Sequence, residues 1–496
     1  MTSPVTLNRL ATGVPGLDTV LGGGLPEYSF NLLAGPPGSG KTTLAHQMMF
    51  ALASPERPAL YFTVLGEPAL KMLRYQQQFE FFDAAAINSS VRFINLTDEA
   101  IVGDLELVLQ RIVAEVTAAG PSLVFVDSFR SVMLASAADG AAATQLQAFV
   151  QQLGVQMTSW QATTFLIGEY FDEEESNPVF TVADGIIWLR QSLQRNSMVR
   201  MLEIKKMRGQ ATLSGLHAFR ITSAGVRVFA PAKNTESTAS PELVLSRLAM
   251  GVPGLDDMLG GGLPNGFSLL VAGPSGSGKS LLAASFLAEG ARRGEHGVIA
   301  SFEQNPNRTR NPMLAGLVSS APVSLLQSRS RELSIDEILV LLIDEIRRTG
   351  ARRVVIDSLS GLELGLAPTF REDFRESLAH LVFALSSEGV TVLVTSELED
   401  RYTDLRFSPY GTAFMTDAII VQRYIEVDSR LRRMMAVVKV RGSAHSDELR
   451  EYTIADGLIV IGERLESQEG LLGGRPTRQR SLLASRGTGT EGTIHA

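Results

Sequence analysis

The sequence contains no cysteine among its 496 residues. This absence excludes disulfide bonds, thiolate-bound metal sites and cysteine nucleophiles. No run of apolar residues approaches the roughly 18 that a membrane-spanning helix needs. The N-terminal segment also lacks a charged region followed by an apolar stretch, so we expect no secretory signal peptide. Together these absences predict a cytoplasmic protein that does not enter a membrane.

An excess of positive charge is absent as well. The 45 lysines and arginines are outnumbered by 53 acidic residues, which gives a net charge of −8 and a pI near 5.5. This balance argues against a broad surface for nucleic acid. A hydrophobic content of 45% is that of an ordinary soluble globular protein.

What the sequence does contain is a duplication. A glycine-rich leader at residues 9–24 matches residues 247–262 at 13 of 16 positions. Each leader is followed by a G-x-x-x-x-G-K-[ST] loop, and the loop lysines, Lys41 and Lys279, are separated by the same 238 residues as the leaders. The sequence therefore predicts two copies of one nucleotide-binding domain.

The chain divides into four parts. We expect the first domain at residues 6–230 and the second at residues 242–466. Residues 231–241 are polar and bounded by prolines, which is typical of a linker. Residues 467–496 are rich in Gly, Ser, Thr and Arg and poor in apolar residues, which predicts a disordered tail.

Within each copy, short apolar runs alternate with helical patterns, which indicates an α/β fold with a mostly parallel sheet flanked by helices. Ser334 and Glu337 form a capping-box pattern at the start of one such helix. The expected strands that lead into the loops are residues 31–34 and 268–272, and the buried strands that end in an aspartate are residues 123–126 and 354–356.

The two loops carry the chemistry of a phosphate site. Their backbone N–H groups surround a phosphate chain, their lysine reaches the phosphate that is transferred, and the next hydroxyl binds Mg²⁺. An aspartate at the end of a buried strand completes the metal site, so both copies are predicted to bind ATP or GTP. The predicted nucleotide-binding residues are Gly35, Pro36, Pro37, Gly38, Ser39, Gly40, Lys41, Thr42, Thr43, Gly273, Pro274, Ser275, Gly276, Ser277, Gly278, Lys279, Ser280 and Leu281, and the predicted metal ligands are Thr42, Asp127, Ser280 and Asp357.

Hydrolysis needs a further group that orients or deprotonates water. In the second copy Glu303 lies 24 residues after Lys279, at the expected end of the neighbouring strand. The same spacing in the first copy reaches Leu65. The catalytic residues predicted from the sequence are therefore Lys41, Lys279 and Glu303, with hydrolysis mainly in the second copy.

Two further features recur in both copies. Glu169 and Glu397 follow apolar strands; we interpret them as surface carboxylates, and the alternative is a place beside the γ-phosphate. The pairs Lys206 with Arg208 and Lys439 with Arg441 place two cations on one face of a strand, which suits a γ-phosphate. Their spacing does not say whether that phosphate belongs to their own subunit or to a neighbour's.

The leader G-V-P-G-L-D-x-x-L-G-G-G-L-P, the Walker loops and the late K-x-R-G segments resemble the KaiC branch of RecA-like ATPases. The resemblance covers nearly the whole chain up to residue 466. It implies two tandem RecA-like P-loop NTPase domains, ATP with Mg²⁺ at subunit interfaces, and a homohexamer. It also implies that Lys206, Arg208, Lys439 and Arg441 contact the nucleotide of the neighbouring subunit.

The chain departs from the family at informative positions. The family carries a Glu-Glu pair where the second copy has Glu303-Gln304 and the first has Leu65-Gly66. Tyr28 replaces the glycine that the second copy keeps at Gly266. The Ser-Thr pair that clock members phosphorylate aligns with residues 413 and 414, which are Ala and Phe.

Several functions remain open from the sequence. The leading hypothesis is a hexameric KaiC-like ATPase whose nucleotide state controls contacts with a protein signalling partner. A Ser/Thr autokinase that uses a shifted acceptor, Thr412 or Thr416, is a second. A non-enzymatic scaffold held together by ATP is a third, and a DNA-handling RecA relative is a fourth that the acidic charge argues against.

Overall fold

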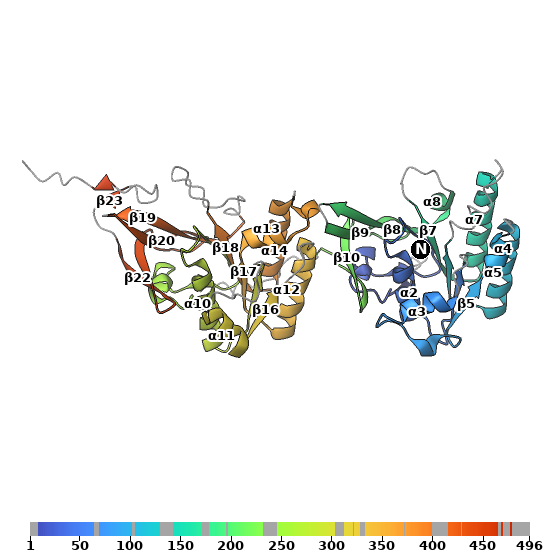
Figure 1. Ribbon diagram of the computed structural model, residues 1–496, viewed down its shortest axis with the longest axis horizontal. Coiled ribbons are helices and arrows are strands. Elements are labelled where there is room, and N and C mark those ends of the chain that lie inside the picture. The colour runs from blue at the N-terminus through green and yellow to red at the C-terminus, as the bar shows by residue number, and fades with distance from the viewer. Residues whose placement is uncertain are drawn as a thin grey trace, which may run out of the picture. The chain divides into compact units, whose positions relative to one another are not determined.

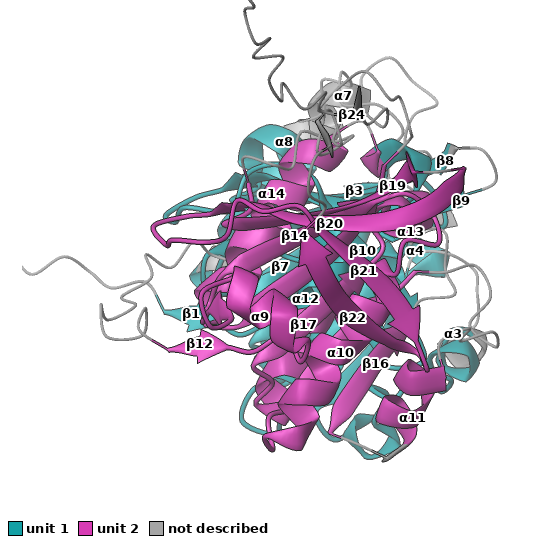
Figure 2. Ribbon diagram, turned by 90° about the vertical axis from the view of Figure 1, so that its left-hand side faces the viewer, with its two compact units in different colours: residues 1–233, 332–340, 367–369 teal, residues 234–331, 341–366, 370–496 magenta. Residues whose placement is uncertain are grey.

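Each copy of the duplication builds its own sheet (Figure 1). The chain forms two compact units, one of residues 1–233, 332–340 and 367–369 and one of residues 234–331, 341–366 and 370–496 (Figure 2). The computed structural model describes residues 8–63, 69–101, 105–128, 142–170, 178–194, 197–231, 246–302, 312–320, 322–327, 333–371, 373–398, 415–427, 429–464, 468–469 and 477–478.

The first copy opens with a short hairpin and then alternates strands and helices. Its elements are β1 (Arg9–Leu10), α1 (Leu17–Leu21), β2 (Leu25–Pro26), β3 (Phe30–Gly35), α2 (Lys41–Leu52), β4 (Ala59–Thr63), α3 (Ala69–Gln76), η1 (Ala84–Ala86), β5 (Val91–Asn95), α4 (Thr97–Ile101), α5 (Leu105–Ala119), β6 (Leu123–Asp127), α7 (Ala142–Ser159), β7 (Thr163–Glu169), α8 (Pro178–Val182), β8 (Gly185–Gln194), β9 (Ser197–Met207), β10 (His217–Thr222) and β11 (Gly225–Val228).

The second copy repeats this succession. Its elements are β12 (Arg247–Leu248), α9 (Pro253–Met258), β13 (Leu263–Pro264), β14 (Ser268–Gly273), α10 (Lys279–Arg292), β15 (Gly297–Ser301), α11 (Pro312–Ser320), β16 (Val323–Gln327), α12 (Ile335–Thr349), β17 (Arg353–Asp357), α13 (Leu359–Gly365), η3 (Pro368–Phe370), α14 (Phe374–Ser387), β18 (Thr391–Glu397), β19 (Ala418–Val427), β20 (Arg430–Val440), β21 (Arg450–Ala455) and β22 (Leu458–Arg464).

The two sheets share one strand order. The first runs β11-β10-β9-β8-β3-β7-β6-β4-β5, and the second, written from the other edge, runs β16-β15-β17-β18-β14-β19-β20-β21-β22. In each sheet the six strands around the loop-bearing strand are parallel, and the remaining three pair antiparallel. The expectation of two mostly parallel α/β domains is confirmed.

Helices cover both faces of the first sheet because successive strand residues point to opposite sides. Leu32 and Phe62 pack with the buried stripes of α5 and α7. Their neighbours Leu33 and Tyr61 pack on the other face with α1 and α2. The parallel strands are therefore buried on both faces and read as continuous apolar runs in the sequence.

The local predictions fit the observed elements closely. The strands expected before the loops and before the aspartates all occur. The Ser334 hydroxyl accepts a hydrogen bond from the Glu337 N–H at 3.1 Å, and α12 begins at the next residue, as an N-cap requires. Among the described residues, no helix combines the length and apolar character needed to cross a bilayer.

The boundaries of the linker and the tail stay predictions, since residues 232–245 and most of residues 467–496 lie outside the described part of the chain. In the C-terminal segment, β23 (Gln468–Glu469) pairs antiparallel with β24 (Thr477–Arg478).

Candidate functional site

Each glycine-rich loop joins the end of a central strand to the start of a helix. β3 and α2 flank the first loop, and β14 and α10 flank the second. The residue before each helix, Gly40 or Gly278, has a φ of 102° or 104°, in a region that other residues avoid. This turn starts α2 at Lys41 and α10 at Lys279, so both lysines and the free N–H groups of a helix terminus lie at the loop.

The loop lysines are partly buried and held close to the loops. Lys41 Nζ donates to the Pro36 carbonyl at 2.8 Å, and Lys279 Nζ donates to the Gly273 and Pro274 carbonyls at 2.8 Å. Burial lowers the pKa of both lysines, and nearby carboxylates partly oppose that shift. A partly desolvated ammonium group of this kind interacts strongly with a phosphate.

The first metal candidates are brought together by the sheet. Thr42 donates its hydroxyl proton to Asp127 Oδ2 at 2.9 Å, although the two residues are 85 positions apart. Tyr61, on the adjacent strand β4, donates to the same oxygen at 2.7 Å. Burial raises the pKa of Asp127, while the hydrogen bonds from Tyr61 and Thr42 lower it. A hydroxyl and a carboxylate side by side are oxygen ligands that suit Mg²⁺.

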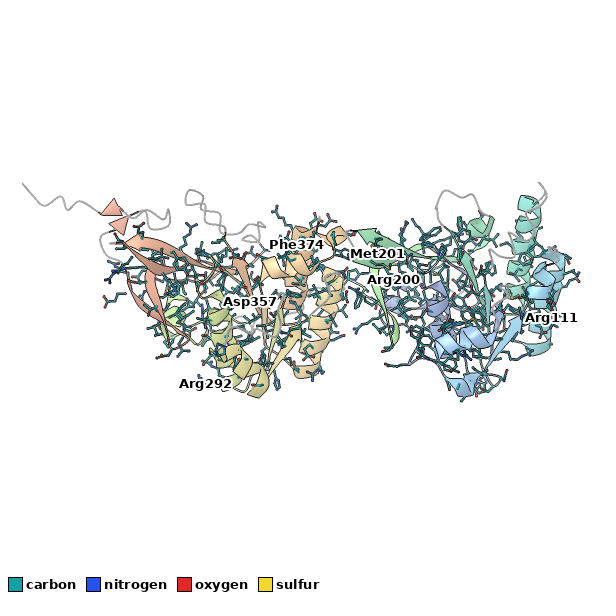
Figure 3. The ribbon with its side chains drawn as sticks, viewed as in Figure 1. Arg111, Arg200, Met201, Arg292, Asp357 and Phe374 are labelled. Carbon is teal, nitrogen blue, oxygen red and sulfur yellow. The ribbon has the colours of Figure 1, made fainter. Side chains whose placement is uncertain are left out.

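The second carboxylate has a different partner. Asp357 ends β17 (Figure 3), and it accepts a hydrogen bond at Oδ1 from the hydroxyl of Thr395 on β18. The position that Tyr61 occupies in the first copy is Ile299 in the second, because β4 and β15 pair with the aspartate strands in the same register. The two metal candidates are thus supported from different neighbouring strands.

Two glutamates join the sites at the ends of strands next to the loops. β7 pairs with β3 so that Glu169 lies opposite Gly35, and β18 pairs with β14 so that Glu397 lies opposite Gly273. Each carboxylate acts on the charge of the loop lysine of its copy. Glu397 is exposed and Glu169 is half-buried, so a surface carboxylate and a place beside the γ-phosphate both stay predictions.

The late basic pairs lie away from the loops of their own copies. Lys206 Nζ donates to the Phe180 and Thr181 carbonyls at 3.1 and 3.0 Å, and Arg208 forms an ion pair with Asp184 at 3.1 Å. The register places Lys206 level with Leu32, about 10 Å of strand before Gly35, and Arg208 lies two residues farther from the loop. A contact with the phosphates of their own copy is therefore excluded.

The second copy repeats this arrangement. Lys439 Nζ donates to the Thr416 carbonyl at 2.6 Å, and Arg441 forms an ion pair with Asp417 at 3.4 Å. β20 pairs with β19 so that Lys439 lies opposite Ile419, which itself lies opposite Leu270 near the start of β14. In both copies the lysine thus donates to backbone carbonyls, and the arginine pairs with the aspartate just before the adjoining strand.

The chain matches the family described as "ATPase: KaiC" twice, over residues 10–233 and 248–466. The chain belongs to the KaiC family of ATPases. It is 27% identical over 486 residues to the circadian clock oscillator protein KaiC of Picosynechococcus sp., a match that covers 95% of this chain and 93% of the relative. It is 26% identical to the KaiC of Rippkaea orientalis over 486 residues and to KaiC 1 of Synechocystis sp. over 492 residues, each match covering 95% of this chain and 92% of the relative.

Membership of the KaiC family makes the chain an ATP-binding protein of an ATPase family, with two tandem KaiC domains. The sequence predicted this family correctly from its leaders and loops. The observed strand order and the loop geometry of both copies agree with it.

Some predicted positions lie outside the described residues. These are Glu303 with Gln304, their counterparts Leu65 and Gly66, and residues 412–414 around the expected acceptor. Thr416 is described and is only 2% exposed. In the first copy, Tyr28 adopts a φ of 63°, the left-handed conformation that Gly266 adopts in the second copy.

The sequence did not point to Tyr61 or Thr395 as partners of the aspartates. Both lie inside mostly buried strands. The available signal was the presence of hydroxyl side chains in both strands, Tyr61 and Thr63 in β4 and Thr391, Thr395 and Ser396 in β18. A buried hydroxyl needs a hydrogen-bond partner.

Proposed function

We propose that this KaiC-family protein binds ATP with Mg²⁺ in both copies and hydrolyses it mainly in the second. In this proposal it acts as a homohexamer in the cytoplasm and changes its contacts with a protein signalling partner according to nucleotide state. The observation that carries the proposal is the recurrence of a loop lysine and a strand-end aspartate around each helix N-terminus.

In each copy, different residues would bind the phosphates and the Mg²⁺ ion. The loop N–H groups and the lysine hold the phosphate chain, since both offer positive potential to the same anion. Thr42 with Asp127, and Ser280 with Asp357, would hold Mg²⁺, which when bound neutralises charge that develops on the phosphates. Asp127 already lies within hydrogen-bond distance of Thr42, which supports that pairing.

The proposed difference in hydrolysis depends on the segments that follow β4 in the first copy and β15 in the second, the strands that pair with the aspartate-bearing strands. In the second copy that segment contains Glu303, and the first copy has Leu65 at the same spacing from the loop lysine. A glutamate can orient or deprotonate the attacking water, and a leucine cannot. Glu169 and Glu397 are the competing bases, because both copies place one beside the loop.

The hexamer supplies a role for the late basic pairs. Lys206 with Arg208, and Lys439 with Arg441, lie too far along the sheet to reach the loops of their own copies. We propose that they contact the nucleotide of the neighbouring subunit. Their cationic side chains suit a phosphate, since lysine and arginine are hydrogen-bond donors only.

The test is steady-state ATP turnover by the full-length protein and by Glu303→Gln, with Glu397→Gln as the matched control at the competing base. We expect Glu303→Gln to reduce kcat by about a hundredfold or more and Glu397→Gln to reduce it far less. Unchanged turnover in Glu303→Gln would show that the base was chosen wrongly. Sizing in ATP and in ADP tests the hexamer.

The burial of Thr416 argues against the autokinase alternative. A hydroxyl that is 2% exposed cannot reach a γ-phosphate without local opening. Mass spectrometry after incubation with ATP and Mg²⁺ tests this alternative, and phosphate at Thr412 or Thr416 would revive it. The relatives named circadian clock oscillator proteins align over 95% of this chain, and we propose a regulatory ATPase in place of an autophosphorylating one.

A further inference from the structure

The two glycine-rich loops differ in the hydrogen bonds that they form with the neighbouring strands of the sheet. Each contains a buried serine just before its last glycine, Ser39 in the first copy and Ser277 in the second, and both are 0% exposed. The Ser277 hydroxyl donates to Gln422 Oε1 at 2.9 Å. The Ser39 hydroxyl has no hydrogen-bond partner among the described residues. The same side chain is therefore anchored in one copy and not in the other.

The reason lies in the strand beside the loop-bearing strand. In the second copy, Gly273 lies against Gln422 of β19. In the first copy, the matching contact of Gly35 is with Leu189 of β8. A leucine side chain cannot accept a hydrogen bond, so the Ser39 hydroxyl has no partner at this position.

A second hydrogen bond to the loop is also present in the second copy and absent from the described residues of the first. The Tyr452 hydroxyl, on β21, donates to the carbonyl oxygen of Ser277. The first copy has Phe219 of β10 under its loop, with the ring edge facing Gly40. Phenylalanine has no hydroxyl to donate, so the carbonyl of Ser39 lacks this support from the sheet.

The hydrogen bond from Tyr452 to the Ser277 carbonyl also orients the N–H group of the same peptide, which belongs to Gly278. In a trans peptide the carbonyl and the N–H point in opposite directions. A hydrogen bond that holds the Ser277 carbonyl toward β21 therefore holds the Gly278 N–H away from β21. That N–H belongs to the last loop residue before α10, where a phosphate would be bound.

We infer that Tyr452 and Gln422 are positioning residues that hold the second loop in its phosphate-binding conformation, and that the first loop lacks both. The inference rests on the proposed nucleotide binding at the second loop. It identifies the class of ligand affected as nucleoside di- and triphosphates, because the anchored peptides are those that face the phosphate chain. Preorganised N–H donors bind an anion more tightly because less conformational freedom is lost on binding.

The test compares nucleotide affinity at single sites of the full-length protein. A Lys41→Ala background reports the second site, and the probe is a fluorescent N-methylanthraniloyl derivative of ATP with Mg²⁺. Tyr452→Phe and Gln422→Leu, which install the residues of the first copy, should each raise the Kd about fivefold, the value of one hydrogen bond. In turnover, KM should rise by the same factor while kcat changes by less than about twofold.

The first copy offers the matched reverse change. In a Lys279→Ala background, Phe219→Tyr should lower the Kd of the first site by about threefold to fivefold. A purely structural role would change thermal unfolding without nucleotide and leave these affinities alone. Lower thermal stability with an unchanged Kd in Tyr452→Phe and Gln422→Leu would therefore overturn the inference.

The outcomes also separate this inference from the function on which it rests. If the Lys41→Ala protein binds no probe while the unaltered protein does, nucleotide binding at the second loop fails, and the inference fails with it. If that background binds the probe and neither substitution at Tyr452 or Gln422 changes the Kd, only the inference is overturned.

Discussion

The two copies share a strand order and a loop geometry, yet the side chains around their loops differ. In the first copy Tyr61 binds the aspartate, Phe219 and Ile221 face Gly40, and Gln191 donates to the Pro37 carbonyl at 3.3 Å. In the second copy Thr395 binds the aspartate, and Tyr452 with Gln422 anchors the loop. The comparison shows that the backbone conformation of the loop does not depend on which side chains surround it. Both copies have the same loop conformation, and the side chains that contact the loop differ between them.

The largest expected effect separates the copies by turnover. Lys279→Ala should lower ATP turnover by about a thousandfold, since it removes the cation nearest the transferred phosphate in the site that carries Glu303. Lys41→Ala should lower turnover much less. Steady-state phosphate release by both variants measures this difference, and equal losses would contradict the assignment of hydrolysis to the second copy.

A smaller effect concerns a buried charge found in the second copy. The Arg353 side chain is 0% exposed, pairs with Glu295 at 2.7 Å and donates to the Phe286 carbonyl at 2.9 Å. The matching first residue of β6 in the first copy is Leu123. Arg353→Ala should destabilise the second copy by about 3–5 kcal/mol, because Glu295 loses its partner.

The tryptophans give this experiment an internal control. Both tryptophans of the chain, Trp160 and Trp188, lie in the first copy. Thermal unfolding followed by circular dichroism should shift in Arg353→Ala, while the transition followed by tryptophan fluorescence stays in place. An equal shift in both signals would show that the copies do not unfold independently.

The next effect in size is a dependence of the stability of the first copy on pH. His46 is 0% exposed, and burial lowers its pKa to about 4. The unfolded chain takes up a proton near pH 6.5 and the folded chain does not, so stability falls as pH drops from about 6.5 toward 4. Between pH 7 and pH 5 the free energy of unfolding should decrease by about 2 kcal/mol.

Denaturant titrations followed by tryptophan fluorescence measure this loss. His46→Gln removes the titrating group and should flatten the dependence, whatever its effect on stability at pH 7. The second copy has Ala284 at the matching position of α10. A decrease of the same size in His46→Gln would assign the dependence to other groups.

The smallest expected effect concerns one backbone conformation. Tyr28 adopts a φ of 63°, where a side chain costs about 1 kcal/mol or more. Tyr28→Gly should therefore stabilise the first copy by about 0.5–1 kcal/mol. Gly266→Ala should destabilise the second copy by a similar amount, because no atom lies within 4 Å of the added carbon and only the backbone is strained. Opposite signs in paired unfolding experiments are the expected outcome.

Much of the fold was predictable because its signals are local. The strands at residues 31–34 and 268–272 are short apolar runs followed by a loop motif, and each forms where the sequence predicted it. The start of α12 followed from the Ser334 hydroxyl and the apolar spacing after it. Such features depend on residues within a few positions of one another.

The composition of the sites was less predictable. Glu169 and Glu397 were interpreted as surface carboxylates, because nothing near them in the sequence shows that β7 and β18 adjoin the loop-bearing strands. The late basic pairs could be recognised in the sequence because they recur in both copies. The sequence did not show which nucleotide they contact, and only the strand register excluded the phosphates of their own copies.

The sequence by itself determined the duplication, the loops and the family, because each is a short pattern that is complete within one stretch of chain. The tertiary structure decided which side chains share a site. Thr42 meets Asp127 across 85 residues, and Tyr452 meets Ser277 across 175. The physical reason is that strand order and register set these distances, and both result from packing of the whole sheet.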